Sequence, residues 1–378
     1  MSRFGWREIA LVIFSLSVSL GMAEYAVRIL APQRLVQDYN VPDPYLGTVI
    51  KPNFESVDRA LLPLYSFRIR TNALGFRMNE DINLSSDIHR VLVLGDSFAF
   101  GWGIAIEKSF VELVKRRAEQ KLPRVQVVNA GMGGYSTAHV YRALAKYYQK
   151  VKPCAAIYFM NPNDPFDNLV TNINYRVASY EKKPNGTISI KDEMVYSPLK
   201  RFLFAWTPYN WLNQHSHLFI LVKRGGSEKR QADPSVYERL DTFGGPFLPP
   251  NQLAEQRQLI IEVTLAHVSR LASLAREVHI PLMIMMIPAL TELFDSHEGF
   301  VTLNDILADI KDGVAKQDVV FVDPLPQMQQ AIAKRFSQKD LYFQDGIPFP
   351  HYNEQGNAVY ASVISESIDN FVEKACIH

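Results

Sequence analysis

Three short apolar runs, each ending at glycine or polar residues, constrain the fold of this chain most. They span Val91–Leu94, Val125–Val128 and Ala155–Met160. Runs of this length are typical of buried strands, and the stretches between them have the apolar spacing of helices. Such alternation predicts an α/β fold, in which a parallel sheet carries helices on both faces. We expect further strands at 280–287 and 319–322, and therefore a five-stranded sheet in a three-layer α/β/α arrangement.

The carboxyl ends of the predicted strands carry the residues with catalytic potential. The first run is followed by Gly95-Asp96-Ser97, the second by a glycine-rich turn and the third by an asparagine-rich turn. Parallel strands end at one edge of a sheet, and open α/β sheets bind their ligands there. A serine hydroxyl is a weak nucleophile that needs a neighbouring base. His351, in the segment 345–356, can supply that base, so the pattern favours a serine–histidine hydrolase over a generic α/β domain.

Four segments, in this order, resemble the sequence blocks of the SGNH hydrolases, also called the GDSL esterase and lipase family. The matching residues are, in block order, Gly95-Asp96-Ser97, Gly134, Asn163-Asp164, and His351 with Asn353 and Gly356. The resemblance covers roughly residues 86–168 and 250–375, and Thr71–Arg77 looks like the lead-in of membrane-anchored bacterial members. It implies the flavodoxin-like three-layer fold of that family.

The resemblance also implies a role for each matching residue. Ser97 would be the nucleophile and His351 its base. The oxyanion hole would consist of the backbone N–H groups of Ser97 and Gly134 and the side-chain amide of Asn163. Preorganised donors of this kind lower the energy of a tetrahedral intermediate. Neither a cofactor nor a metal is implied.

The chain departs from the family pattern at two places. Asn161, followed by Pro162, stands where the third block usually has glycine. The family's aspartate usually lies three positions before the histidine, where this chain has Pro348, and the nearest preceding acid is Asp345, six positions before His351. We expect the loop to return Asp345 to the histidine as the third catalytic residue. The alternative is a serine–histidine dyad in which a main-chain carbonyl orients the imidazole.

These residues predict an esterase or acylhydrolase that works through a Ser97 acyl-enzyme. The substrate class that we expect is an O-acyl group on an envelope glycan, by analogy with the family and from the expected location. One alternative is an O-acyltransferase that uses the same site and obtains its acyl donor from a partner in the envelope polysaccharide machinery. Another alternative is a catalytically inactive, glycan-binding envelope protein, which the unusual spacing of Asp345 would suit.

The N-terminus predicts a membrane anchor. Arg3 and Arg7 precede the apolar stretch Ile9–Ala23, whose length lies between that of a signal peptide and that of a span. Glu24 and Arg28 are four residues apart and can pair near the interface. We expect an uncleaved single-pass helix in the cytoplasmic membrane, with the catalytic part in the periplasm by the positive-inside rule. A signal peptide that is cleaved, giving a secreted protein, and a soluble amphipathic helix are the alternatives.

The expected organisation has an anchor at 1–30, a proline-rich and irregular lead-in at 31–85 and a hydrolase domain at 86–378. An insertion at 165–250 interrupts the strand and helix alternation. It is rich in aromatic residues, which argues against disorder. It is either a small packed subdomain or a cap whose rings line a sugar or acyl pocket beside Asn163.

Composition adds limits of a general kind. A hydrophobic content of 47% and a charged content of 21% are those of a globular protein, and a net charge of +1 gives no case for nucleic-acid binding. Cys154 and Cys376 are far apart in sequence, so we expect two unpaired thiols.

Overall fold

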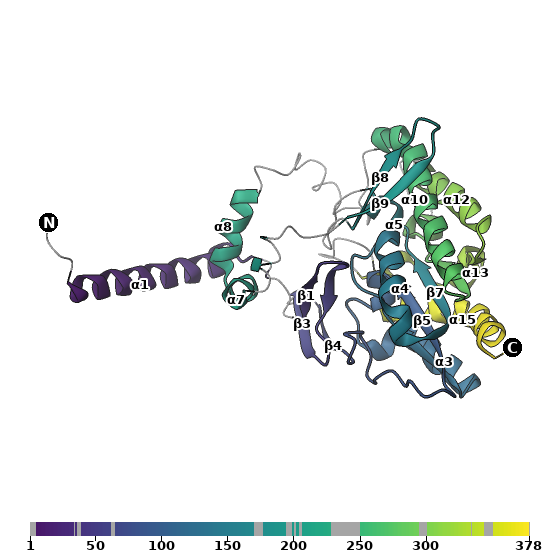
Figure 1. Ribbon diagram of the computed structural model, residues 1–378, viewed down its shortest axis with the longest axis horizontal. Helices are drawn as coiled ribbons and strands as arrows, with labels where there is room; N and C mark the ends of the chain where they lie inside the picture. The colour runs from purple at the N-terminus through teal and green to yellow at the C-terminus, as the bar shows by residue number, and fades with distance from the viewer. Residues whose placement is uncertain are drawn as a thin grey trace. The chain divides into compact units, whose positions relative to one another are not determined.

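The computed structural model of the chain describes residues 5–33, 35, 39–61, 65–169, 177–193, 199, 202–203, 206–227, 250–294, 301–333, 335–343 and 351–377. The chain divides into two compact units, each described by itself below (Figure 1). The smaller unit combines residues 1–40 with 196–234, and the larger unit combines 41–195 with 235–378.

The larger unit is built on a five-stranded parallel sheet. Its strands are β5 (His89–Gly95), β6 (Val125–Asn129), β7 (Pro153–Met160), β10 (Leu282–Met286) and β11 (Val320–Val322). They lie in the order β11-β10-β7-β5-β6, and each neighbouring pair is parallel. The chain therefore adds β6 on one side of β5 and then crosses to β7 on the other, which makes the β5–β7 edge the topological switch point. The predicted α/β fold with a five-stranded parallel sheet is confirmed.

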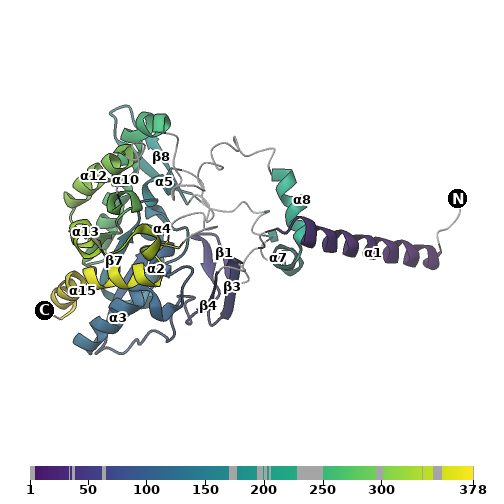
Figure 2. The same cartoon turned by 180° about the vertical axis from the view of Figure 1, so that it is seen from behind.

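One face of the sheet is covered by α3 (Phe110–Lys121), α13 (Leu325–Ile332) and α15 (Glu354–Cys376) (Figure 2). Alternate strand residues such as Val93 and Ile157 pack into this layer and are almost completely buried. Both faces of a parallel sheet are covered by helices, so its strands are apolar almost throughout rather than alternating with polar residues.

The opposite face is covered by α4 (Thr137–Val151), and α10 (Pro250–Glu277) packs against α4 and α12 (Val301–Ala315). Val268 and Leu271 of α10 are fully buried, so the apolar side of this long helix faces the core. The remaining short helices of the larger unit are α2 (Ser97–Phe100), η1 (Ile106–Lys108), α5 (Asp164–Asp167), α11 (Leu290–Leu293) and α14 (Gln338–Leu341).

The lead-in, expected to be irregular, contains two small sheets. These pair β1 (Asn40–Asp43) with β2 (Gly47–Ile50), and β3 (Glu55–Leu61) with β4 (Tyr65–Arg70). Arg77, which is fully buried, follows them. Its guanidinium donates to the carbonyl oxygens of Phe100 (2.9 Å), Ile104 (2.7 Å) and Arg68 (3.0 Å). Arg77 therefore ties the lead-in to the loop that follows Ser97, which is a structural role.

A hairpin of β8 (Ala178–Lys182) and β9 (Ile188–Asp192) lies within the predicted insertion. The carboxylate of Asp192 accepts hydrogen bonds from Arg142 of α4 (3.3 Å) and Arg270 of α10 (2.9 Å). These ion pairs attach the hairpin to the helices on that face of the sheet.

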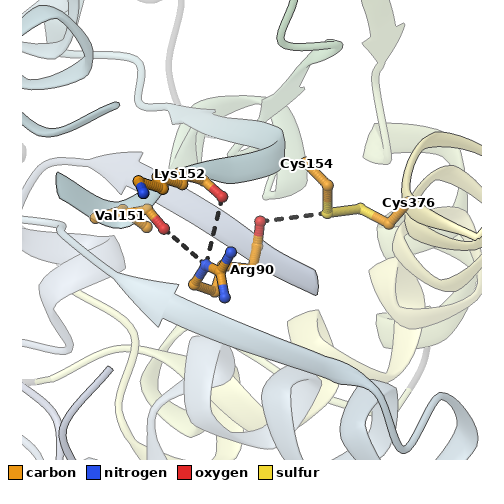
Figure 3. Close-up of a disulfide and its surroundings, with 5 residues drawn as sticks. All are labelled: Arg90, Val151, Lys152, Cys154 and Cys376. Carbon is orange, nitrogen blue, oxygen red and sulfur yellow. Dashed lines mark hydrogen bonds between the residues drawn. A yellow bond between two sulfur atoms is a disulfide. The ribbon is translucent and has the colours of Figure 1, made fainter. Parts of the chain in front are cut away.

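The two cysteines form a disulfide, so the expectation of unpaired thiols is wrong (Figure 3). Cys154 lies at the start of β7 and Cys376 in the last turn of α15, with their Cα atoms 5.3 Å apart. Their separation of 222 residues says nothing about distance in the fold, because α15 runs back along the sheet. Disulfides persist mainly in oxidising compartments.

The smaller unit contains α1 (Trp6–Leu30), α7 (Thr207–His215) and α8 (His217–Ser227). None of the α1 residues is buried, and α1 is the only helix among the described residues that is long and apolar enough to cross a membrane. The expected Glu24–Arg28 ion pair is present at 3.1 Å.

Candidate active site

Ser97 is presented by a sharp transition from strand to helix. Strand β5 ends at Gly95, and Ser97 is the first residue of α2. Gly95 has a φ of +153°, and a Cβ atom there would lie 2.8 Å from the Cβ of Ala99 and 3.0 Å from the carbonyl oxygen of Phe159. Only glycine fits this close approach of the turn to β7 and α2. The serine hydroxyl is thereby placed at the carboxyl end of a central strand.

His351 meets Ser97 across 254 positions of sequence. Ser97 Oγ lies 2.7 Å from His351 Nε2, which is hydrogen-bond distance. The imidazole is buried between two aromatic rings: Phe98 stacks on it with a centroid distance of 4.8 Å, and Trp102 lies tilted at 4.8 Å. The structure brings these two sequence-predicted residues together, and it adds Phe98 and Trp102, which the sequence analysis did not identify, as the residues on either side of the ring.

The loop that carries His351 is held by the residues after it. Asn353 caps α15, because its side-chain oxygen accepts the N–H of Gly356 at 3.0 Å, and its own N–H donates to the carbonyl oxygen of Leu341 at 2.9 Å. A Cβ at Gly356 would lie 2.1 Å from that same carbonyl oxygen. The Asn-x-x-Gly spacing after the histidine therefore has a structural cause. It sets the residue at which α15 begins, and this holds the backbone that carries the imidazole.

Asp345 lies outside the described residues, in the gap between Phe343 and His351. Its place as the third catalytic residue stays a prediction. The described flanks of the gap are joined, because the N–H of Phe343 donates to the carbonyl oxygen of His351 at 3.0 Å. Phe343 and His351, the described residues on the two sides of this gap, therefore lie next to each other.

Gly134 lies in the glycine-rich turn after β6. Gly134 has a φ of +76°, a left-handed conformation that favours glycine. A Cβ at the neighbouring Gly133 would lie 3.9 Å from the Cβ of Ser97, and one at Gly131 would lie 2.8 Å from the Cβ of Ala99. The glycines thus let this turn pass directly over α2. Donation from the Gly134 N–H to an oxyanion stays a prediction.

Asn163 lies at the N-terminus of α5, which follows β7. Its side-chain N–H donates to a carboxylate oxygen of Asp167 at 3.0 Å, and its side-chain oxygen has no hydrogen-bond partner within the described residues. Burial raises the pKa of Asp96, which adjoins Ser97, and a hydrogen bond from the Asn163 side chain lowers it in part. Asn163 is therefore beside the candidate nucleophile, while its role as an oxyanion donor stays a prediction.

Asp96 and Asn161 form a buried pair beneath the serine. Asp96 Oδ1 accepts the N–H of Phe98 at 2.9 Å, and its Oδ2 accepts the side-chain N–H of Asn161 at 2.6 Å and lies 3.5 Å from Ser97 Oγ. Burial raises the pKa of Asp96 to about 6, although the hydrogen bonds from Asn161, Phe98 and Asn163 lower it in part. One signal for this pair was visible in the sequence, where Asn161 stands in place of the glycine of the third block.

Asp164 braces the same region from the opposite side. It is fully buried, and one carboxylate oxygen accepts the hydroxyl of Tyr158 at 2.6 Å and the N–H of Asn161 at 2.9 Å. Burial, followed by the nearby Asp96 charge, raises the pKa of Asp164 well above its usual value. Asp164 therefore anchors the turn that presents Asn161 and Asn163. Within the part of the chain that the structure describes, no cluster of three histidine, cysteine or acidic side chains is placed to hold a metal.

No protein-family model matches this sequence, and no curated protein is detectably similar to it. Comparison of the fold finds solved structures of esterases and lipases. The esterase EstA from Pseudoalteromonas sp. is 11% identical over 75% of this chain and 99% of its own, with a TM-score of 0.39. The acetyl xylan esterase AlAXEase is 12% identical over 74% and 99%, with a TM-score of 0.40, and a GDSL-like lipase from Bacteroides thetaiotaomicron is 10% identical over 74% and 88%, with a TM-score of 0.36. These superpositions are partial, so the chemistry of this chain is inferred from its own residues.

Proposed function

We propose that this chain is a serine ester hydrolase of the SGNH type, with Ser97 as nucleophile and His351 as general base. The observation that carries the proposal is the 2.7 Å approach of Ser97 Oγ to His351 Nε2 at the carboxyl edge of a parallel sheet. A neutral imidazole at this distance can remove the serine proton as the hydroxyl attacks a carbonyl carbon.

The proposed reaction has two steps. Ser97 Oγ bonds to the ester carbonyl carbon, and His351 takes the serine proton and passes it to the departing alcohol. Water then attacks the acyl-serine, His351 accepts a proton from that water and returns it to Ser97, and the free acid leaves. In both steps the carbonyl oxygen becomes an oxyanion, which the N–H groups of Ser97 and Gly134 and the amide of Asn163 would stabilise.

The proposed substrate is an O-acyl group on an envelope glycan, reached from a membrane anchor formed by α1. Three observations support an extracytoplasmic location: the apolar α1, the basic residues that precede its apolar stretch, and the Cys154–Cys376 disulfide. The disulfide is independent of the anchor, because it lies in the other unit.

Fluorophosphonate labelling tests the nucleophile. The reagent should label the wild-type protein once, at Ser97, and should not label Ser97→Ala. The variant Ser362→Ala, which changes an exposed serine of α15, serves as the matched control and should label normally. The same pair should separate in hydrolysis of p-nitrophenyl acetate, where Ser97→Ala loses activity and retains its circular dichroism spectrum. A wild-type protein that takes up no label would instead favour an inactive, glycan-binding protein.

Incubation of an acylated glycan in H₂¹⁸O distinguishes hydrolysis from transfer. A hydrolase releases free acid with one oxygen from the solvent water, and mass spectrometry of the acid in H₂¹⁸O detects that atom. An O-acyltransferase would instead move the acyl group to an added glycan acceptor, and little labelled acid would form. Transfer to the added glycan would be consistent with the Ser97 acyl-enzyme, but it would show that the final acceptor is the glycan and not water.

A further inference from the structure

A side chain of α1 caps the first turn of α8. The carboxylate of Glu24 accepts hydrogen bonds from the Ser216 hydroxyl (2.7 Å) and from the backbone N–H groups of His217 (2.9 Å) and Leu218 (2.9 Å). The first N–H groups of a helix lack partners within the helix, and the helix dipole favours a negative charge there. One carboxylate therefore attaches α8 to the C-terminal half of α1 through three bonds.

The same end of α1 also holds the turn between α7 and α8. Arg28 donates to the carbonyl oxygen of His215, the last residue of α7, at 2.9 Å. The N–H of Gln33 donates to Nδ1 of His217 at 2.8 Å. Figure 1 and Figure 2 both draw α7 and α8 against the C-terminal end of α1. The helical hairpin of α7 and α8 is thus fixed at a definite level along α1.

The hairpin has a buried and an exposed apolar side. Ile220 of α8 is buried within the unit, whereas its neighbours Leu221 and Val222 are 38% and 67% exposed. Trp206 and Trp211 are 51% and 57% exposed. We call the residues Trp206, Trp211, Leu221 and Val222 the outer apolar set. A short surface helix in water normally exposes polar residues on its outer side. A group of exposed apolar side chains is instead typical of a surface that contacts a second apolar environment.

The dimensions of α1 indicate which environment that is. The rise of 1.5 Å per residue places Glu24 about 26 Å beyond Arg7 along the helix axis, close to the roughly 30 Å thickness of the hydrocarbon core. A span that begins near Arg7 therefore ends near Glu24, where the hairpin is attached. Tryptophan is enriched at this level of a bilayer, and amphipathic helices lie in it.

We propose that the hairpin of α7 and α8 is a second membrane-contact element, with its outer apolar set inserted among the lipid headgroups at the outer end of α1. The inference rests on α1 being the proposed membrane span, and not on the hydrolase chemistry. The occupant to which the structure points is lipid, because the hairpin is bonded to α1 at the level where the span meets the headgroups.

Site-specific probes in the full-length protein test this placement. The dye NBD is attached to Val222→Cys, to Leu16→Cys in α1 and to Ser362→Cys in α15, under non-reducing conditions that keep the native disulfide intact. Each protein is reconstituted in vesicles of phosphatidylcholine and phosphatidylglycerol that carry lipids brominated near the headgroup or near the bilayer centre. We expect the Val222 probe to shift to the blue and to lose most of its emission to the shallow bromines. The Leu16 probe should respond to the deep bromines, and the Ser362 probe to neither.

The alternative results separate the two claims. A quenched Leu16 probe with an unquenched Val222 probe would overturn the inference and leave the anchor in place. A Val222 probe that is blue-shifted but insensitive to bromine would also overturn it, by showing that protein covers this face. Absence of quenching at both positions would overturn the anchor and the inference together, while p-nitrophenyl acetate hydrolysis by the same preparation would report separately on the proposed hydrolase.

A second variant tests the attachment itself. Glu24→Gln retains one acceptor oxygen but loses the charge, so amide hydrogen exchange at His217 and Leu218 should become about fivefold to tenfold faster. The Val222 probe should then be quenched less by shallow bromines. Glu8→Gln, at the other end of α1, is the matched control and should change neither signal. Unchanged exchange in Glu24→Gln would show that the carboxylate does not hold α8.

Discussion

The side-chain amide of Asn161 donates a 2.6 Å hydrogen bond to the buried carboxylate of Asp96, the residue that immediately precedes Ser97. Asp96 also caps the helix that Ser97 begins. Glycine, which the SGNH pattern has at position 161, could not make this bond. The departure from the family pattern therefore has a physical effect in this chain. Asn161 supplies a hydrogen bond to the carboxylate of Asp96, which burial makes costly to ionise.

We expect Asn161→Ala to destabilise the protein more at pH 8 than at pH 5. The pKa of Asp96 in the folded protein, about 6, lies above the ordinary value of 3.8. The stability that Asp96 contributes to the folded protein is therefore fully present below the ordinary pKa of 3.8 and is lost as the pH rises through about 6. Loss of the Asn161 donor raises that pKa further and should cost about 1–3 kcal/mol of unfolding free energy at pH 8. Urea denaturation at both pH values measures the difference. Asn357→Ala, which removes another buried asparagine, should lower the free energy of unfolding by the same amount at pH 5 and at pH 8.

Asn163→Ala should lower kcat on p-nitrophenyl acetate by about a hundredfold or more, because it removes a proposed oxyanion donor. Thermal unfolding should change little. Since the Asn163 amide also donates to Asp167 at 3.0 Å, Asp167→Ala serves as the control that removes this bond and keeps the Asn163 amide. A kcat in Asn163→Ala that matches the kcat of Asp167→Ala would mean that positioning by Asp167, and not donation to an oxyanion, accounts for the effect.

Asp345→Asn distinguishes a catalytic triad from a dyad. If Asp345 orients the far nitrogen of His351, an amide in its place favours the wrong tautomer, and kcat should fall by about ten-thousandfold, as in the serine-protease precedent. Discontinuous hydrolysis assays, in which the enzyme is incubated with substrate for several days, can measure a loss of kcat of that size. Asp340→Asn changes an acid on α14 before the same loop and should have a small effect on kcat. A dyad predicts that both variants stay within about tenfold of wild type.

Replacement of both cysteines by serine should lower the free energy of unfolding by about 2–5 kcal/mol, because the reduced chain regains entropy when it unfolds. Denaturant titration of the double variant measures this loss. Dithiothreitol should lower the Tm of the wild type and leave the Tm of the double variant unchanged. Equal effects of the reductant on both proteins would show that the Cys154–Cys376 bond does not contribute to stability.

His267 of α10 should make the protein sensitive to acid. Burial, helped by the charge of Arg270 and by His139 and opposed by Asp192, lowers the pKa of His267 from 6.5 to about 3. A lowered histidine pKa gives stability that is present above pH 6.5 and is lost as the pH falls toward about 3. His267→Gln should therefore flatten the decline of unfolding free energy between pH 6.5 and pH 4, whereas His279→Gln, a surface change at the end of the same segment, should not. An unaltered slope in His267→Gln would show that other groups govern acid unfolding.

The sequence indicated Ser97 and His351 by different signals. Ser97 follows a strand whose apolar pattern is clear and so was placed at the carboxyl edge of a parallel sheet, whereas His351 was identified by the resemblance of its segment to a sequence block. Their separation of 254 residues was therefore no obstacle. The Asn353 and Gly356 spacing gave further support, since helix caps have local sequence signals.

The features that sequence did not predict depend on distances between elements. Cys154 and Cys376 were expected to be unpaired because nothing in either neighbourhood encodes their 5.3 Å Cα separation, which results from how α15 packs along the sheet. Trp102 resembles any surface-loop aromatic in sequence, yet its ring lies beside the imidazole of His351. Asn161 was noted as a departure, but its partner could be identified only once β5 and β7 were adjacent.

The Cys154–Cys376 bond closes a covalent ring that contains His351 but not Ser97. A protease that cuts the chain once between Cys154 and His351 yields two fragments, with the serine on one and the histidine on the other. The disulfide keeps these fragments joined, so the two halves of the proposed catalytic pair cannot diffuse apart. A nicked molecule would run as two bands on a reducing gel and as one on a non-reducing gel, and the cut alone would not separate the nucleophile from its base.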